Sequence, residues 1–378
     1  MTVELRGCYP ILATPFLPDG EIDENGVVRL VRHLKTCGLP GFTMFGLVSE
    51  FYKLSDADRD ALIETAFDAR APDQTAIVSV TAHSHEVAVK QARRAELAGA
   101  EALMLLPPFF LGPSEEEIRR HVLEVAEATS LPVVLQYAPA QTGIKMSAES
   151  FLEFNRRAPN VCYVKVESAP PGPLISSITE GSSGEIKCLI GHGGLQLVDG
   201  FRRGAVGVQP ASGVADYYPH ILRALEGGDL EAAYALHADL LPLVNLLMQA
   251  IEPLNRMEKI VLEKRGIIAH DYCRAASYEP DDLMLTELDR WQAAPFRAVA
   301  DRRRRPTLLR EKIVGPKPDT VFAGSVAQRT TSRARATRCL LSQQDRHSRG
   351  ACPRESGEQE SATAGAALLG PEAMTRIA

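Results

Sequence analysis

The sequence lacks the features of a membrane or secreted protein. It contains no run of about 18 or more uncharged apolar residues, the length that a membrane-spanning helix needs. Its N-terminus does not show the pattern of a signal peptide. The seven cysteines form no Cys-x-x-Cys pair, a usage that suits reduced thiols. These absences predict a cytoplasmic protein with no membrane partner.

The two ends of the chain differ in charge. Residues 296–378 carry 16 Lys/Arg and 8 Asp/Glu, so the formal net charge of −6 for the whole chain leaves −14 on residues 1–295. The basic segment holds four consecutive arginines, Arg302 to Arg305, among scattered serine, threonine, glutamine and alanine. This composition predicts a disordered basic extension. No aromatic residues are interleaved with the arginines, so a solvated tail is favoured and no nucleic-acid partner is expected.

Strand-like and helix-like segments alternate from residue 7 to about residue 225. Strict alternation implies a parallel sheet, and eight units in roughly 220 residues predict an α/β fold, a closed (β/α)8 TIM barrel over residues 1–225. Residues 226–295 are predicted to add three helices, and residues 296–378 form the extension. The predicted strands are 7–13, 41–46, 75–81, 102–108, 132–138, 162–168, 186–192 and 205–211.

Lys165 lies in an otherwise apolar segment, the sixth predicted strand. A buried ammonium without a partner is unfavourable, so such a lysine tends to lose its proton, and the neutral amine can attack a ketone to form a Schiff base. The alternative is a strand-end lysine whose amine reaches water or pairs with a carboxylate. Because barrel enzymes carry out chemistry at the C-terminal ends of the strands, we expect Lys165 near that rim.

The alternation of side chains along a barrel strand predicts which residues accompany Lys165 in the lumen. Glu167 shares its face, one step nearer the rim. On the fifth strand Gln136 points inward at a similar depth, which leaves Tyr137 facing the outer helices. Glu167 is then a candidate for moving protons at the substrate, and the alternative is an ion pair that only positions the lysine.

Short motifs follow the predicted strands in a fixed order, and together they resemble the dihydrodipicolinate synthase and N-acetylneuraminate lyase superfamily of Schiff-base barrel enzymes over about residues 5–290. The resemblance implies that Lys165 condenses with pyruvate or a related 2-keto acid, and that the protein is a homotetramer. No cofactor is expected. The motifs are Thr14-Pro15-Phe16, Gly46-Leu47-Val48-Ser49-Glu50, Pro107-Pro108-Phe109-Phe110, Tyr137-Ala138-Pro139-Ala140-Gln141-Thr142-Gly143 and Lys165 itself.

Several positions depart from the family pattern. Leu47 and Val48 replace hydroxyl residues that help bind the keto acid and relay protons, although backbone N–H groups of that loop can still hold a carboxylate. Phe110 replaces a tyrosine. Leu47, Val48 and Phe110 are nevertheless expected to contact the substrate, because they occupy the positions of those family residues. The family's acid/base tyrosine lies three residues before the motif proline, where this chain has Gln136. Tyr137 is one position away, and a one-residue shift turns a strand residue to the other face. Both are candidate catalytic residues, and the register favours Gln136 over Tyr137 at the family position. The sequence therefore favours a subgroup without the usual catalytic tyrosine.

Five further side chains are considered for substrate contacts or metal binding at the rim. Gln141 stands where the family synthases have an arginine for a dicarboxylic second substrate, so aspartate semialdehyde is not expected as a substrate. His192, between glycines at the end of the seventh strand, is expected to contact the substrate, as is Gln209 on the eighth. His83 and His85 follow the third strand, but no third ligand has supporting spacing, so no metal site is predicted.

Three functions fit these residues. The first is an aldolase-type lyase that acts on a 2-keto acid through a Schiff base at Lys165. The second uses the same imine to dehydrate or decarboxylate a sugar-derived 2-keto acid. The third, prompted by the missing proton relay, is a catalytically weak barrel that binds a keto acid as a sensor or scaffold.

Overall fold

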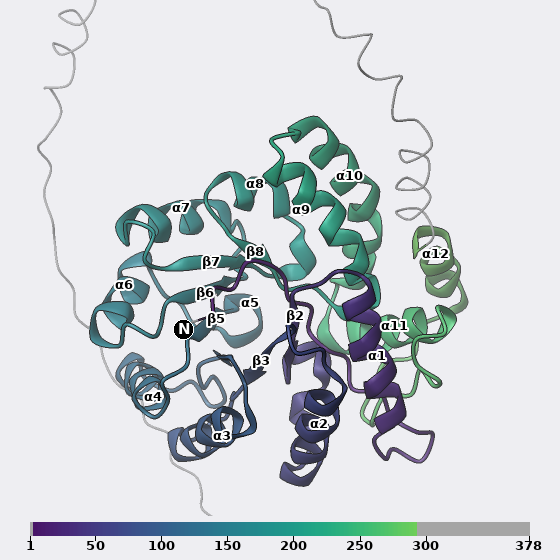
Figure 1. The fold of residues 1–378 in the computed structure, drawn as a ribbon, viewed down its shortest axis with the longest axis horizontal. Coiled ribbons are helices and arrows are strands. Elements are labelled where there is room, and N and C mark those ends of the chain that lie inside the picture. Colours follow the sequence, from purple (N-terminus) through teal and green to yellow (C-terminus); the bar gives the residue numbers. More distant parts are fainter. Residues whose placement is uncertain (1–2, 293–378) are drawn as a thin grey trace, which may run out of the picture. The chain divides into compact units, whose positions relative to one another are not determined.

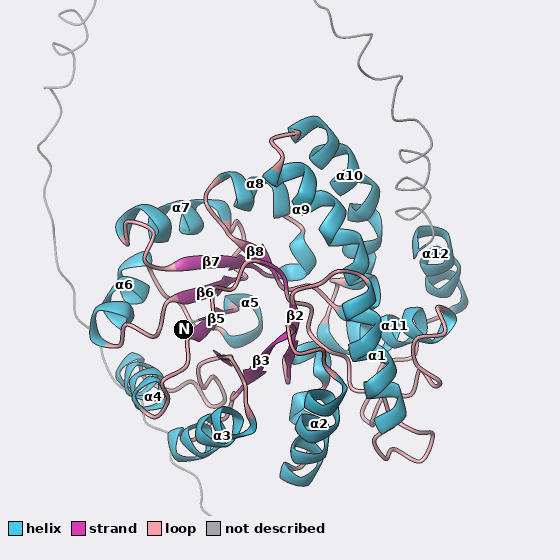
Figure 2. Ribbon diagram, in the orientation of Figure 1, coloured by secondary structure: helices cyan, strands magenta, loops and turns pink. Residues whose placement is uncertain are grey.

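Eight parallel strands form one sheet in the part of the chain that the computed structural model describes, residues 3–292. The order of the strands is β1-β8-β7-β6-β5-β4-β3-β2, and helices surround them (Figure 2). The strands are β1 (Gly7–Cys8), β2 (Gly41–Met44), β3 (Thr75–Ser79), β4 (Ala102–Leu105), β5 (Val133–Tyr137), β6 (Tyr163–Val166), β7 (Lys187–Ile190) and β8 (Gly207–Val208).

Hydrogen bonds between the two ends of this order close the sheet. The backbone N–H of Thr43 donates to the Pro10 carbonyl at 2.8 Å, and the N–H of Leu12 donates to the Thr43 carbonyl at 2.8 Å. Ile11 also forms bridges with both Thr43 and Ala211, so the segment after β1 joins β2 to the segment after β8. The predicted (β/α)8 barrel is confirmed, and each strand lies inside its predicted range.

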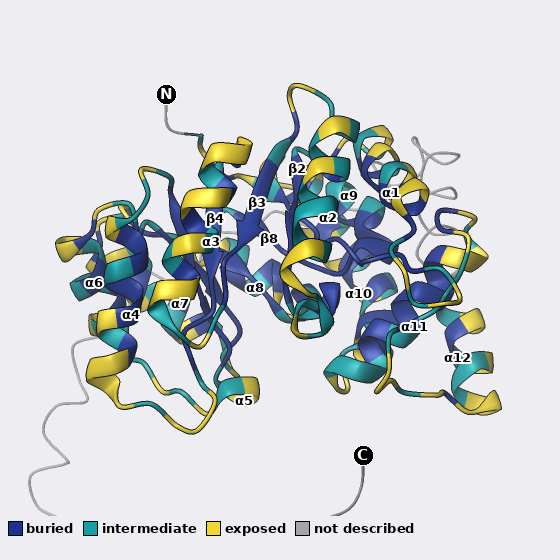
Figure 3. Cartoon of the chain, turned by 90° about the horizontal axis from the view of Figure 1, so that it is seen from below, coloured by how far each residue is buried: buried dark blue, intermediate teal, exposed yellow. Residues whose placement is uncertain are grey.

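The strands are buried on both faces. Every residue of β4 and of β5 is buried, because helices cover the outside of the barrel and side chains from other strands fill the inside. Figure 3 shows the buried strands in the middle and the exposed residues on the outer helices. A polar side chain in such a strand, like Lys165 in β6, is therefore held away from water.

The helices of the barrel lie outside the strands, except the short helix α5, which overlaps the middle of the barrel in this view (Figure 1). They are α1 (Glu24–Thr36), α2 (Asp56–Ala69), α3 (His85–Ala98), α4 (Glu115–Glu127), α5 (Pro139–Thr142), α6 (Ala148–Arg157), α7 (Gly172–Gly181), α8 (Leu197–Arg202) and α9 (Tyr218–Glu226). Short 3-10 helices occupy loops after the strands: η1 (Leu47–Ser49), η2 (Phe51–Lys53), η3 (His192–Gly194) and η4 (Ser212–Tyr217).

Polar caps explain where several of these helices begin. The Ser55 side chain accepts the Asp58 N–H at the start of α2, and the Asp58 side chain in turn accepts the Ser55 N–H, which forms a capping box. The side chains of Asp23, Ser84 and Ser114 accept backbone N–H groups in the first turns of α1, α3 and α4. Each cap fixes the point at which the chain leaves a loop and returns along the barrel wall.

Three helices follow the barrel: α10 (Leu230–Leu247), α11 (Ile251–Lys264) and α12 (Asp282–Gln292). They lie together at one side of the barrel (Figure 1). Within residues 3–292, no helix is long and apolar enough to span a bilayer. The domain boundaries at 225 and 295 stay predictions. The extension predicted for 296–378 lies outside the described residues.

Candidate active site

Three polar side chains meet inside the barrel at Lys165. The register of β5 and β6 pairs Gln136 with Lys165, as the alternation of the strands predicts. Lys165 is only 4% exposed, and its Nζ lies 3.4 Å from Oε1 of Glu167. The second carboxylate oxygen of Glu167 accepts a hydrogen bond from Nε2 of Gln136 at 2.7 Å. The predicted lumen-facing group is therefore confirmed as a contiguous cluster.

The Glu167 carboxylate is fixed by its surroundings. The backbone N–H of His192 donates to Oε1 at 3.2 Å, and Gly191 leaves the space that the side chain needs, since a Cβ there would lie 2.1 Å from Glu167 Cγ. Burial raises the pKa of this carboxyl. The charges of Lys165 and His192, together with the hydrogen bonds from Gln136 and the His192 backbone, lower the pKa by more than burial raises it. The pKa is thus below its ordinary value, and the group is ionised at neutral pH.

Tyr137 points away from this cluster. Its hydroxyl accepts the backbone N–H of Met146 at 3.2 Å, and its ring packs edge-on against Phe151 with the centroids 5.5 Å apart. Phe151 belongs to α6, on the outer side of the strand. This placement agrees with the outward orientation predicted from the strand alternation. The catalytic roles assigned to Gln136 and Tyr137 stay predictions.

The cluster lines a cavity of about 30 Å³, enough space for one or two water molecules. All but one of the predicted substrate-binding residues also line it, namely Leu47, Val48, Gln141, His192 and Gln209. The buried amide of Gln209 donates to Oγ1 of Thr43 at 2.8 Å, while its Oε1 has no hydrogen-bond partner among residues 3–292. An unpaired buried acceptor is costly, so this oxygen suits a donor group of a bound molecule or a water.

Part of the cavity wall comes from outside the barrel. Met248 lies just after α10, and Ile251 and Leu254 lie on α11, and all three line the cavity with apolar groups. The sequence analysis missed these residues. The helical periodicity of α11 identifies an apolar face, but nothing in the sequence says that this face covers the mouth of the barrel.

Comparison with known proteins decides the family. The model of the Dihydrodipicolinate synthetase family matches residues 4–290. The chain belongs to this family. It is therefore an enzyme of a Schiff-base lyase family.

Proteins named for different activities are similar to the chain. A 4-hydroxy-tetrahydrodipicolinate synthase of Sorangium cellulosum is 30% identical over 267 residues, which are 69% of this chain and 87% of that protein. An L-2-keto-3-deoxyarabonate dehydratase of Azospirillum brasilense is 28% identical over 256 residues, 64% of this chain and 79% of that protein. The crystal structure of dihydrodipicolinate synthase from Rhodopseudomonas palustris matches with a TM-score of 0.72 and 27% identity, covering 77% of this chain and 97% of that chain.

One residue aligned with the family motifs lies away from the cavity. Phe110 is 67% exposed, and its ring lies 5.8 Å from the ring of His83, centroid to centroid. It does not line the cavity around Lys165. Its predicted contact with substrate stays a prediction. Sequence spacing placed Phe110 after β4 but could not give the direction of a side chain in a loop without regular periodicity.

A second group of buried charges holds the family motif after β2 in place. Glu50, the last residue of that motif, is fully buried and forms an ion pair with Lys259 of α11, which is also fully buried. Lys53 contacts Glu50 at 3.1 Å and Glu252 at 2.8 Å. The sequence analysis identified Glu50 only through the motif. The pairing with Lys259 spans more than 200 positions, and no spacing rule predicts it.

A groove larger than the cavity at Lys165 lies elsewhere on the barrel. A groove of about 430 Å³ lies between α4, α6 and the segment before α6, and it is lined by charged and apolar residues such as Arg119, Lys145 and Phe154. No residue of the Lys165 cluster contributes to it. Chemistry, rather than volume, identifies the smaller cavity as the candidate active site.

Proposed function

We propose that the protein is a lyase that binds a 2-keto acid as a Schiff base on Lys165. The observation that carries the proposal is the lysine itself, which is buried at 4% exposure in a barrel strand and contacts an ionised carboxylate. Membership in the dihydrodipicolinate synthetase family supports it. A lysine amine, a carbonyl substrate and a nearby proton acceptor are the requirements of this reaction.

The reaction needs protons to move at the lysine nitrogen. The ammonium must lose a proton before the amine attacks the ketone carbon, and Glu167 Oε1, at 3.4 Å, is the contacting oxygen that can accept it. The resulting carbinolamine loses its oxygen as water once that oxygen is protonated, which leaves a cationic imine. The fixed carboxylate stabilises this cation, because the charge develops where Glu167 already points.

The cavity lining suggests how a keto acid is held. The first N–H groups of η1, those of Leu47 and Val48, have no acceptor within that helix, so they can receive the substrate carboxylate. Gln209 Oε1 and the Gln141 side chain are available to hydroxyl groups on the rest of the substrate. The apolar wall formed by Ile251 and Leu254 limits how many polar groups the substrate carries.

Reductive trapping tests the proposal. The protein is incubated with a panel of 2-keto acids and borohydride, and the covalent adduct is read by intact mass. We expect an adduct with at least one member of the panel and none in Lys165→Ala. Lys187→Ala is the matched control, because Lys187 also lies on a barrel strand but at its N-terminal end, away from the cavity. An adduct that persists in Lys165→Ala would overturn the assignment.

Dehydration of a sugar-derived 2-keto acid is a second candidate, because one of the similar proteins bears the name of such a dehydratase. Product analysis separates the two: cleavage of a carbon–carbon bond supports an aldolase, and loss of water supports a dehydratase. Decarboxylation would release CO₂. Trapping of a keto acid without any turnover would instead support a sensor or scaffold. With Gln141 in place of the arginine, we expect no turnover of pyruvate with aspartate semialdehyde at a typical enzyme rate of about 1–10³ per second.

We also propose a cytoplasmic homotetramer without membrane or nucleic-acid partners. The five cysteines among the described residues are all free thiols, which suits a reducing compartment. The tetramer rests on the family resemblance. Light scattering coupled to gel filtration measures the mass in solution, and a monomer of 41.1 kDa would contradict this part of the proposal.

A further inference from the structure

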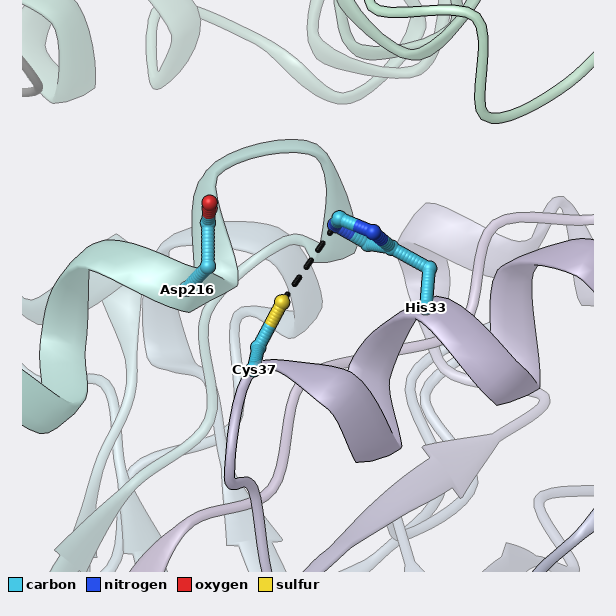
Figure 4. A group of neighbouring side chains, drawn as sticks. All are labelled: His33, Cys37 and Asp216. Atoms are coloured by element: carbon cyan, nitrogen blue, oxygen red, sulfur yellow. Dashed lines mark hydrogen bonds between the residues drawn. The ribbon is translucent and has the colours of Figure 1, made fainter.

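Three side chains able to ligate a metal meet outside the barrel, far from Lys165. His33 and Cys37 lie at the end of α1, and Asp216 lies in η4, which follows the last strand. Their ligand atoms all lie within 4.8 Å of one another, and all three residues are partly buried. Figure 4 shows the imidazole and the thiol turned toward each other from α1, with the Asp216 side chain beside them on η4.

The spacing of the donor atoms fits a tetrahedral ion. Sγ of Cys37 lies 3.5 Å from Nε2 of His33. For zinc, with Zn–S of about 2.3 Å and Zn–N of about 2.0–2.1 Å, tetrahedral angles place sulfur and nitrogen about 3.5 Å apart. The two residues are four positions apart on a helix, so both side chains leave the same face and little rearrangement is needed.

We propose that His33, Cys37 and Asp216 form a binding site for Zn²⁺ or a similar divalent transition-metal ion. The set offers one nitrogen, one sulfur and one oxygen ligand, the donors that zinc takes in proteins, and leaves a fourth position for water. On binding, the Cys37 thiol gives its proton to solvent and the sulfur bonds to the ion. Carboxylate, thiolate and Zn²⁺ together carry no net charge.

A thiol beside an imidazole can also serve as a reactive, nucleophilic cysteine. The surroundings of Cys37 do not suit that function. Burial raises the pKa of Cys37 to about 11, and the charge of Asp216 raises it further, against smaller opposing contributions from Thr36 and Arg265. A thiol that keeps its proton at neutral pH is a weak nucleophile, whereas a metal ion displaces that proton directly.

Arg265 must be compatible with a cation at this place. It donates to both oxygens of Asp216, at 3.1 and 2.6 Å. A carboxylate has about four lone-pair positions, so each oxygen keeps one for a metal ion, and the arginine fixes the carboxylate as hydrogen-bonding partners of metal ligands commonly do. Its positive charge weakens cation binding, and we therefore expect the site to select an ion that bonds to thiolate over Mg²⁺ or Ca²⁺.

The site joins two segments that are far apart in the sequence. The α1 helix precedes β2, and η4 follows β8, so the ion would tie together the helical layer on both sides of β1. A ligand that binds only the folded state stabilises it. The proposal is independent of the Schiff-base chemistry, because none of the three residues lines the cavity at Lys165.

Cobalt binding tests the site, because a thiolate bonded to Co²⁺ absorbs light in the near ultraviolet. The full chain is treated with chelator and reductant and then titrated with Co²⁺. Cys339 and Cys352 lie outside the described residues, so the titration is done in a background in which both are serine. We expect one equivalent of Co²⁺ to give the thiolate band, and Zn²⁺ to displace it.

Substitutions identify which residues give rise to the cobalt–thiolate band. Cys37→Ser should abolish the thiolate band, and His33→Ala should weaken Co²⁺ binding at least tenfold, with folding checked by circular dichroism. Cys162→Ser is the control, because Cys162 is another partly buried thiol that lies outside the cluster. Zn²⁺ should also raise the melting temperature of the parent protein by several degrees and leave that of Cys37→Ser unchanged. No thiolate band in the parent, or a band that persists in Cys37→Ser, would overturn the proposal.

Discussion

At the scale of single residues, Glu167 is a candidate for two functions: it moves protons at the substrate, or it positions Lys165 as an ion-pair partner. Its contacts bear on both. The carboxylate accepts bonds from Gln136 and from the His192 backbone, and it contacts Lys165. Its lowered pKa makes it a stable counter-ion for a cationic imine and a weak base, because a carboxyl of low pKa holds a proton poorly. A base that accepts a proton and returns it within the same turnover is still compatible with these contacts, since Glu167 is the charged partner of the lysine.

Glu167→Gln separates the two functions. If the carboxylate moves protons, the variant should still form a slow, trappable imine, but turnover should fall by about 10²–10⁴-fold, the usual contribution of a positioned proton-transfer group. If it only positions the lysine, turnover should stay within about tenfold and the pH dependence of trapping should shift. The measurements are steady-state turnover and the rate of borohydride trapping against pH.

Tyr137→Phe is the matched control for this experiment. The tyrosine hydroxyl bonds to the Met146 backbone outside the barrel, so its loss should cost about 1 kcal/mol of stability at most and leave turnover within about tenfold. A large loss of turnover in Tyr137→Phe, together with little change in Glu167→Gln, would return the acid/base function to the tyrosine.

At the scale of elements, α11 supports the rim of the barrel from two neighbouring positions. Lys259 reaches the loop after β2, where it pairs with Glu50, and Glu258 reaches the segment after β8, where it accepts the N–H groups of Ser212 and Gly213 at 2.7 and 3.1 Å. Because β1 lies between β8 and β2 in the barrel, a single helix turn holds the loops on both sides of it. The cavity wall depends on the same helix through Leu254.

Lys259→Met should be strongly destabilising. The lysine is fully buried, contacts Glu50 and the Tyr272 carbonyl at 2.9 Å, and lies over the ring of Phe16 at 4.3 Å. Its removal leaves the buried charge of Glu50 with one partner fewer, a change that costs about 3–5 kcal/mol in comparable buried pairs. Urea unfolding measures the free energy of unfolding.

Lys264→Met makes the same substitution on the same helix at a residue with 37% side-chain exposure, paired with Asp289. It should cost about 1 kcal/mol or less, because exposed ion pairs contribute little. If the two variants were destabilised equally, the buried pair would not be what fixes the rim.

Glu258 makes the stability of the fold depend on pH. Burial raises the pKa of its carboxyl to about 7, although the bonds from Ser212 and Gly213 and the charge of Lys259 oppose this. The folded state therefore holds a proton that the unfolded state loses near pH 4.5. The free energy of unfolding should fall as the pH rises from about 4.5 to 7, by up to about 3 kcal/mol, and the loss should be complete above that range.

Glu258→Gln should remove this component and flatten the dependence of stability on pH between 5 and 8. Glu263→Gln, at an exposed position of the same helix, should leave the dependence as it is. Urea unfolding at several pH values measures both. An unchanged profile in Glu258→Gln would assign the dependence to other groups.

The sequence predicts elements and their faces better than it predicts contacts between elements. The period-two alternation along β5 and β6 correctly placed Gln136, Lys165 and Glu167 together, because neighbouring strands share a register. It did not predict the contribution of α11, because a helical pattern shows which face is apolar and not what it covers. Buried charges such as Lys259 also resemble surface residues in a sequence, since their partners lie hundreds of positions away.

At the scale of the whole molecule, the predicted basic extension remains to be tested, because it lies outside the described residues. Brief digestion of the full chain with dilute trypsin should remove residues beyond about Arg305 first, since disordered basic segments are cut readily. Mass spectrometry identifies the fragments, and the remaining core should still form the Lys165 adduct. Cleavage within the first 290 residues while the segment beyond Arg305 stays intact would contradict the prediction.

The small size of the cavity has a kinetic consequence. About 30 Å³ holds water but not a keto acid, and part of the wall is the connection between α10 and α11 at Met248 and Ile251. If a keto acid is the substrate, we expect it to enter only in molecules whose connection has moved, so that the apparent affinity is reduced in proportion to the fraction of such molecules. In stopped-flow mixing, the observed association rate should level off at high keto-acid concentration, at the rate of opening. Met248→Ala should raise that plateau, and a rate that rises linearly without limit would show that the entrance is already open.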